Sequence, residues 1–407
     1  MALRLANAFG AALRGLGIRV PRLDLRALLR ATGIEDAHFD KALDAAFIDR
    51  LQVLLDDADG AARLNHVGRY VLRTRLSTMV AARLRVRQWL AEHPRTLDVP
   101  VERPLFIVGP PRSGTSLLYD LLAQDPQVRA PRLWEADSPV PPPVPDGGRD
   151  DPRYKRCARD LARLRKYAPN LAIAHELAVD APHECFAFLE ASAFSPTFLI
   201  YLHAPAYWKR LLAASNDEAR EAYALFRRQV QIFLVRAQGR RWLSKSPAHM
   251  GFLDSLAGAF PDCAIVSTRR EPLESIPSLC SLTAMVRSVG SDDVRPAEIG
   301  REIFDGFVES ARREEAAQAA LGFGRVHDVA YARLAAVPVG VVREIYERYD
   351  FAYTRVFERR MQAWLAAHPR HAHGVHEYSL TQFGLDREEV FEATDGYRRR
   401  YLADAIT

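Results

Sequence analysis

The stretch PLFIVGPPRSGTSLL, residues 104–118, decides the fold of this chain. A short apolar run leads into a loop rich in Gly, Pro, Ser and Thr, and an apolar helical pattern follows. Gly109 and Gly114 let the backbone approach an anion closely, and the amides at the start of the following helix point at that anion. Strand, glycine-rich turn and helix together predict a phosphate-binding loop in an α/β protein.

This loop lacks the lysine of an ATP-binding loop. A Walker loop reads GxxxxGK[ST], whereas here Thr115 follows Gly114 directly and Arg112 is the only cation. An ATPase or an ordinary kinase is therefore disfavoured, although a P-loop nucleotide kinase stays open as an alternative. Arg112 is able to clamp a terminal anionic group through two parallel hydrogen bonds. We predict anion contacts from Pro111, Arg112, Ser113, Gly114, Thr115 and Ser116.

A second candidate anion site lies in CAIVSTRREPLESIPSLCSL, residues 263–282. CAIVS has the pattern of a buried strand, and Arg270 follows its carboxyl end, where open α/β sheets bind ligands. Ser278 comes about two helical turns later and is therefore expected to face the same anion.

With these two motifs the chain resembles the sulfotransferases that depend on 3′-phosphoadenosine-5′-phosphosulfate (PAPS). That family pairs a P-x-[KR]-S-G-[TS] loop for the 5′-phosphosulfate with an R-x-P-x-[DE]-x-x-x-S element for the 3′-phosphate. The corresponding stretches here are PPRSGTS at 110–116 and REPLESIPS at 270–278. The chain most resembles the bacterial branch with KSPAH and R-[DE]-P-L-E motifs, because WLSKSPAHM occurs at 242–250.

The resemblance implies PAPS as co-substrate and a hydroxyl-bearing acceptor, which is a small molecule, a lipid or a carbohydrate. It implies no metal, because Arg112 and Lys245 would neutralise the leaving 5′-phosphate. Lys245 would also stabilise the moving sulfuryl group. Arg270 and Ser278 would hold the 3′-phosphate. A segment near the C-terminus closes over this phosphate in related enzymes, and PRHAHGVHEY (369–378) occupies its place with His371 and Gly374.

The general base is a harder assignment. The cytosolic branch of the family has a His two residues after the lysine, but Pro247 stands there in this chain. The Golgi branches use a Glu after the second strand, and Glu135 lies at the corresponding place. We therefore predict Glu135 as the base, with Trp134 beside it to raise its pKa by desolvation. His249, four residues after Lys245, is the second choice.

The stretch DAPHECF, residues 180–186, also contains titratable side chains. Its spacing fits no zinc signature, and we predict no metal site in the chain. Asp180 is expected to begin a helix, and the family suggests that the stretch lies on the acceptor side. We assign it no catalytic role. The aromatic residues that follow, between 186 and 208, predict core packing or an apolar acceptor pocket.

The chain divides into two predicted regions. Residues 1–98 space their apolar positions three and four apart and form a helical N-terminal subdomain. Residues 99–407 form the sulfotransferase domain, in which four short strand candidates, PLFIVG, RRWLSKSP, CAIVSTRR and FGRVHDVAY, alternate with helices. The predicted fold is therefore α/β, a P-loop-like parallel sheet flanked by helices. The proline-rich stretch 138–152 is either a linker or a wall of the substrate entrance.

Bulk properties limit the function classes. A net charge of +5, with 26% charged and 48% hydrophobic residues, is typical of a globular protein that handles anionic small molecules rather than nucleic acid. Four scattered cysteines favour a reducing, cytoplasmic location.

The first 23 residues are basic and lack any acid. They predict a helix packed on the protein, a targeting segment or peripheral membrane contact. A non-catalytic nucleotide-binding or membrane-associated protein is therefore a third hypothesis. The sequence leaves the acceptor and the oligomeric state open.

Overall fold

A five-stranded parallel sheet forms the centre of the molecule in the computed structural model, which describes residues 2–34, 45–145, 147–169, 177–369 and 379–403. The strands lie in the order β2-β3-β1-β4-β5. Their bounds are Leu105–Val108 for β1, Val128–Arg129 for β2, Arg241–Lys245 for β3, Ala264–Arg269 for β4 and Val326–Ala330 for β5. The four predicted strands are β1, β3, β4 and β5, and the predicted α/β fold is confirmed. Because β3 and β4 flank β1, the carboxyl end of β1 faces the crevice where such sheets bind ligands.

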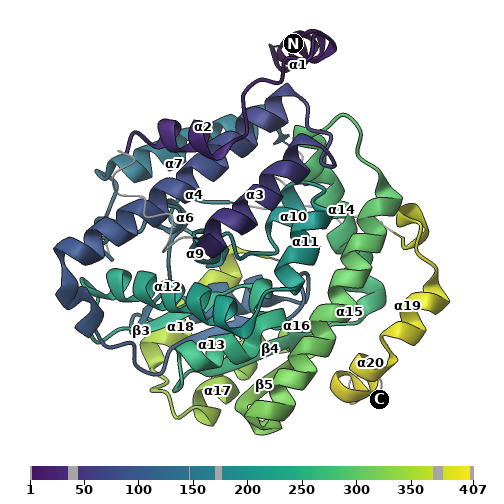
Figure 1. The fold of residues 1–407 in the computed structure, drawn as a ribbon. Coiled ribbons are helices and arrows are strands. Elements are labelled where there is room, and N and C mark those ends of the chain that lie inside the picture. The colour runs from purple at the N-terminus through teal and green to yellow at the C-terminus, as the bar shows by residue number, and fades with distance from the viewer. Residues whose placement is uncertain (1, 35–44, 146, 170–176, 370–378, 404–407) are drawn as a thin grey trace.

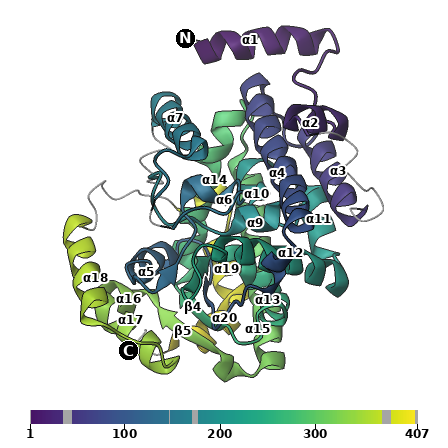
Figure 2. The ribbon, with the colours of Figure 1, turned by 90° about the vertical axis from the view of Figure 1, so that its left-hand side faces the viewer.

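Helices cover both faces of the sheet because successive strand side chains point to opposite sides. Phe106 and Val108 of β1 enter one apolar cluster, which includes side chains of α12 (Asn216–Leu234) and α13 (Leu253–Ala259). Leu105 and Ile107 enter another, which includes side chains of α5 (Thr115–Leu122), α17 (Pro338–Arg348) and α18 (Arg355–Ala367). Figure 2 shows the sheet between these two groups of helices.

Residues 2–98 are helical in the described part, as predicted. One apolar cluster joins Leu28, Phe47 and Leu76 of this region to Phe106 and Phe188 of the remainder. Helix α3 packs against α11, and α4 packs against α14. The boundary at residue 98 thus divides two stretches of chain that share a core, and the division into domains stays a prediction.

The helices follow one another around this core (Figure 1). Their bounds are Ala2–Gly15 (α1), Leu25–Thr32 (α2), Ala45–Asp59 (α3), His66–Glu92 (α4), Thr115–Leu122 (α5), Leu133–Ala136 (α6), Pro152–Tyr167 (α7), Phe186–Glu190 (α9), Phe198–Tyr201 (α10), Pro205–Leu212 (α11), Asn216–Leu234 (α12), Leu253–Ala259 (α13), Pro272–Gly290 (α14), Pro296–Leu321 (α15), Tyr331–Ala336 (α16), Pro338–Arg348 (α17), Arg355–Ala367 (α18), Arg387–Ala393 (α19) and Asp395–Tyr401 (α20). Short 3₁₀ turns are Pro94–Asp98 (η2), Pro247–Phe252 (η3), Phe323–Arg325 (η4) and Thr381–Phe383 (η5). No helix in the described ranges combines the length and the apolar character that crossing a bilayer requires.

Candidate active site

The predicted anion loop joins the end of β1 to the start of α5. Gly109 has φ +114°, and a Cβ atom on it would lie 2.5 Å from the carbonyl oxygen of Thr268 on β4. Gly114, at φ +91°, is the N-cap of α5, and a Cβ there would meet the ring of Tyr331 at 2.7 Å. Both glycines are therefore required by backbone conformation and by the close approach of neighbouring atoms.

Ser113 holds the loop in shape. Its buried hydroxyl donates to the carbonyl of Pro110 at 2.6 Å and lies 2.6 Å from the hydroxyl of Thr268. Thr115, the first residue of α5, is also buried. These two side chains serve the fold, so the anion-binding capacity of residues 111–116 rests on the backbone amides at the helix start, on Arg112 and on Ser116.

The structure brings the two predicted anion motifs into direct contact. Arg112 has φ +67° and donates from Nε to the hydroxyl of Ser278 at 3.2 Å. Arg270 donates from Nη1 to the backbone carbonyl of Arg112 at 2.9 Å, and its guanidinium lies over the ring of Tyr331. Two arginines and a serine hydroxyl from the carboxyl ends of β1 and β4 therefore form one basic cluster.

Its neighbour Arg269 does not join this cluster. The Arg269 side chain has no exposed surface and pairs with Glu314 at 2.8 Å and with Asp328 at 2.6 Å. It also lies over the ring of Tyr401 at 3.8 Å. Of these two adjacent arginines, Arg269 ties β4 to β5, α15 and α20, whereas Arg270 pairs with the exposed Glu274 and lies against the anion loop.

Lys245 is the last residue of β3 and lies beside β1, with Ile107 as its register partner. Only 3% of its side chain is exposed. Its ammonium donates to the hydroxyl of Ser116 at 3.2 Å and forms an ion pair with Glu184. Lys245 therefore links the anion loop to a carboxylate on the other side of the crevice.

Glu184 is the functional candidate that our reading of the sequence set aside. Residues 181–185 cross the carboxyl end of β3: His183 donates its backbone amide to Pro131 at 2.8 Å, and Cys185 donates its amide to Lys245 at 3.1 Å. Asp180 begins no helix, contrary to our prediction, and accepts a hydrogen bond from Tyr154 instead. The side chain of Glu184 remains 24% exposed, so a substrate has access to it.

Glu135, our predicted base, has a different environment. Its side chain has no exposed surface, lies 2.9 Å from Arg129 and accepts the backbone amide of Arg132 at 2.8 Å. Burial raises the pKa of Glu135, and Arg129 opposes that rise. A carboxylate that is fully buried and ion-paired is poorly placed to meet an acceptor hydroxyl, so the geometry argues against Glu135 as the base and favours a structural role.

We expect Glu135→Gln to lower the free energy of unfolding by about 3–5 kcal/mol, because Arg129 is then left buried without a counter-charge. Urea unfolding measures this loss. Turnover of the folded fraction is expected to stay within about twofold of the unchanged protein, which is a far smaller effect than a base contributes. A protein of unchanged stability with a large turnover defect would restore Glu135 as the base.

His249, our second choice, also lies in the core. Its ring has no exposed surface, with Nδ1 2.9 Å from the hydroxyl of Tyr223 and Nε2 3.1 Å from the sulfur of Cys185. Burial lowers the pKa of His249 to about 3. Both ring nitrogens are engaged inside the protein, so His249 does not reach an acceptor.

Two further predicted contacts, His371 and Gly374, lie outside the described residues. Within the described ranges, no group of three or more His, Cys, Asp or Glu side chains is arranged to hold a metal ion.

The aromatic residues between 186 and 208 divide into two groups. Phe188, Phe194, Phe198 and Tyr207 are fully buried and pack in the core. Phe186 and Tyr201 are only partly buried. Phe186 lies 5.2 Å from the ring of His183, and Arg75 lies over its other side. Phe186 comes two residues after Glu184, so the chain beside this carboxylate carries a partly buried aromatic ring.

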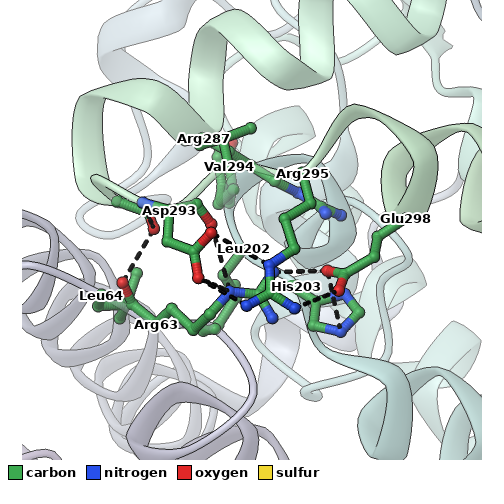
Figure 3. A pocket seen from close by; sticks show the side chains of 12 residues that line it. Arg63, Leu64, Leu202, His203, Arg287, Asp293, Val294, Arg295 and Glu298 are labelled. Atoms are coloured by element: carbon green, nitrogen blue, oxygen red, sulfur yellow. Dashed lines mark hydrogen bonds and ion pairs between the residues drawn. The ribbon is translucent and has the colours of Figure 1, made fainter. Parts of the chain in front are cut away.

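A separate hollow lies away from this site, between the α3–α4 turn and the α14–α15 connection. Figure 3 shows Arg63, His203 and Arg295 gathered around the carboxylates of Asp293 and Glu298. Arg63 pairs with Glu298 at 2.5 Å. The remaining space is about 10 Å³, room for about one water. These ion pairs fill the hollow and fasten the N-terminal helices to the rest of the molecule.

Comparisons with known proteins identify the family and the fold. A family model described as "Sulfotransferase family" matches residues 104–355. Omega-hydroxy-beta-dihydromenaquinone-9 sulfotransferase Stf3 of Mycobacterium bovis is 23% identical over 72% of this chain and 74% of its own length. The crystal structure of sulfotransferase STF1 from Mycobacterium tuberculosis has a TM-score of 0.82 and 27% identity, over 93% of this chain and all of that chain. Sulfotransferase STF9 from Mycobacterium avium has a TM-score of 0.83 and 25% identity, over 93% and 95%.

Proposed function

We propose that this chain, which belongs to the sulfotransferase family, transfers the sulfuryl group of PAPS to a hydroxyl of an acceptor molecule. One observation carries the proposal: the ammonium of Lys245 contacts both Ser116 of the anion loop and the carboxylate of Glu184. A sulfuryl group has to pass from a donor in the anion loop to an acceptor beside a base. Lys245 lies between the anion loop and Glu184, the candidate base.

The donor fits the basic cluster. The amides at the start of α5, with Arg112 and Ser116, would hold the 5′-phosphosulfate. Arg270 and Ser278 would hold the 3′-phosphate, and they lie next to Arg112 as one bound nucleotide requires. Arginine suits both groups because its planar guanidinium presents paired donors to anionic oxygens.

The chemistry is an in-line displacement at sulfur. The acceptor oxygen forms a bond to sulfur while the bond between sulfur and the 5′-phosphate oxygen breaks. The proton of the acceptor hydroxyl passes to the carboxylate of Glu184, and the 5′-phosphate leaves with the electron pair. Lys245 stabilises the negative charge that builds up on the bridging oxygen, which a preorganised cation does without reorganisation.

The acceptor is an alcohol with an apolar body. Phe186 and Tyr201 lie on the acceptor side, and burial raises the pKa of Tyr201, so that ring stays neutral. The name of the Mycobacterium bovis relative describes an acceptor that is a hydroxylated menaquinone, a lipid. We therefore propose a hydroxylated lipid or a similar apolar alcohol for this chain.

Calorimetry with adenosine 3′,5′-bisphosphate tests the donor. We expect binding in the absence of Mg²⁺, since the cluster supplies its own cations. Incubation with ³⁵S-labelled PAPS and a lipid extract then tests transfer. If binding heat were measured only with ATP and Mg²⁺, the result would favour a nucleotide kinase. If the nucleotide bound but no labelled product formed, the result would favour the non-catalytic hypothesis.

Arg270→Ala is expected to raise the Michaelis constant for PAPS about tenfold to a hundredfold, because hydrogen bonds to charged groups contribute about 1.5–3 kcal/mol. Turnover should change much less, since the 3′-phosphate is remote from sulfur. Steady-state kinetics with varied PAPS measures both constants. Glu274→Gln is the matched control, because it removes the exposed ion-pair partner of Arg270 and leaves the arginine in place. A defect confined to turnover would refute the assignment of Arg270 to the 3′-phosphate.

A further inference from the structure

An apolar stripe runs along the outer side of α1. Leu5, Phe9 and Leu16 are 64%, 62% and 75% exposed. Leu5 and Phe9 are four residues apart and lie on one face of α1, where Ala12 is also exposed, and Leu16 follows directly after the last residue of the helix. Large apolar side chains at this exposure are unusual for a helix that only packs on its own protein.

The opposite side of α1 is fixed to the protein. Asn7 accepts the backbone amide of Val67 at 3.0 Å, and Arg14 donates to the carbonyl of Leu64 at 2.6 Å. Gly10 lies so close to His66 that a Cβ would be 2.3 Å from the Cβ of that residue. Because these contacts hold α1 on the first turn of α4, its apolar stripe cannot turn inward.

Other exposed apolar side chains lie nearby. Ile18 follows α1 and is 47% exposed, and Tyr70 and Val71, in the first turns of α4, are more than half exposed. Figures 1 and 2 show α1 standing clear of the molecule at one end, with the start of α4 and α7 at that same end. Six of the twelve large apolar side chains that are exposed in the described part thus belong to α1, its following loop and the start of α4.

Helix α7 adds positive charge at this end. Its sequence, PRYKRCARDLARLRKY, contains seven basic residues and one acid. Arg156 also lines a hollow of about 370 Å³ between α4 and α7 together with Arg73 and Arg85. Asp137, which pairs with Arg75, lines the same hollow, so its lining carries these three arginines and one acid and remains net basic.

We propose that this end of the molecule, the docking face, binds a lipid bilayer that carries anionic head groups. We define the docking face as Leu5, Phe9, Leu16, Ile18, Tyr70 and Val71 together with the exposed Arg156, Arg159 and Lys166 of α7, because Arg153, Lys155 and Arg163 of this helix pair with acids. Apolar side chains that enter the acyl boundary beside cations that meet the head groups are the two parts of an interfacial membrane site. An anionic bilayer offers an apolar interior and acidic head groups along one continuous surface, which matches an apolar stripe that lies beside cations.

Helix α7 connects the docking face to the proposed active site. Tyr154 in its first turn donates to Asp180, which lies in the loop that carries Glu184. Helix α7, one part of the docking face, is therefore in contact with the loop that carries Glu184. The docking itself rests on the exposed residues alone and does not depend on the proposed reaction.

Vesicle sedimentation tests the proposal. The full chain is expected to pellet with vesicles of phosphatidylcholine and phosphatidylglycerol at low salt, and to bind much less to phosphatidylcholine alone or at about 0.5 M NaCl. The triple variant Leu5→Ser, Phe9→Ser, Leu16→Ser should bind at least about tenfold more weakly, because each exposed side chain loses its burial in lipid. The matched control is a second triple variant that removes three exposed apolar side chains elsewhere on the protein, Leu97→Ser, Val337→Ser and Val356→Ser.

Charge is tested separately. A triple variant that removes three positive charges from α7 should bind the anionic vesicles more weakly; its substitutions are Arg156→Gln, Arg159→Gln and Lys166→Gln. A control variant that removes three positive charges elsewhere should bind as the unchanged protein does. Its substitutions are Arg228→Gln on α12, Arg236→Gln just beyond α12 and Arg360→Gln on α18. Failure of the unchanged protein to pellet with anionic vesicles would overturn the proposal. The proposal would also be overturned if light scattering showed that the unchanged protein is a dimer and that the apolar triple variant is a monomer. A second copy of the chain would then cover the stripe.

Discussion

Glu184→Gln is expected to lower turnover about a hundredfold to ten-thousandfold, the range that a positioned general base contributes. The amide keeps the size and shape of the side chain but cannot take the proton of the acceptor hydroxyl. Because Glu184 is partly exposed and lies at the end of a loop, the fold should tolerate the change. Steady-state kinetics at saturating PAPS and acceptor measures the loss.

The matched control is Asp180→Asn, an equal loss of charge in the same loop. Asp180 contacts Tyr154 and lies 3.7 Å from Arg132, away from Lys245, so its turnover should remain close to that of the unchanged protein. Binding of adenosine 3′,5′-bisphosphate to the Glu184→Gln protein should be retained, which separates a lost base from a lost donor site. A Glu184→Gln protein with near-normal turnover would remove Glu184 from the mechanism.

The sheet and the donor cluster were accessible from the sequence because local patterns determine them. Apolar runs identified β1, β3, β4 and β5, and the glycines of the loop identified the crevice. Strand β2 was missed because it has only two residues, Val128 and Arg129. The rule that parallel strands end at the same edge of a sheet predicted that both motifs lie at one edge, whereas the direct contact between Arg112 and Ser278 was not predicted.

The proposed base, Glu184, was not accessible in the same way. Glu135 and Glu184 both follow apolar segments, and the sequence does not show that Arg129 neutralises the first carboxylate. The decisive contact is the backbone hydrogen bond from Cys185 to Lys245, which joins residues far apart in the chain. A single sequence carries no signal for such a pairing. The same limit applies to His249, whose burial depends on Tyr223 and Cys185 around it.

Lys245→Met is expected to reduce turnover about a hundredfold to a thousandfold, as the loss of one preorganised donor to developing charge does in other enzymes. Methionine preserves most of the length and the apolar stem while removing the ammonium. Glu184 then loses its ion-pair partner, but its exposed part can be solvated, so a folded protein is expected. Lys209→Met, at an exposed position on α11, controls for the loss of a lysine.

The double variant Lys245→Met, Glu184→Gln distinguishes a shared step from two separate roles. If lysine and carboxylate act on opposite sides of one transferring group, the double variant should lose little more than the more damaged single variant, because residues that act as a unit are strongly non-additive. Independent roles would multiply the two losses. A Lys245→Met protein whose defect is confined to the Michaelis constant for PAPS would show that the ammonium binds the donor without stabilising the transfer, and the contact between Lys245 and Glu184 would then have no catalytic meaning.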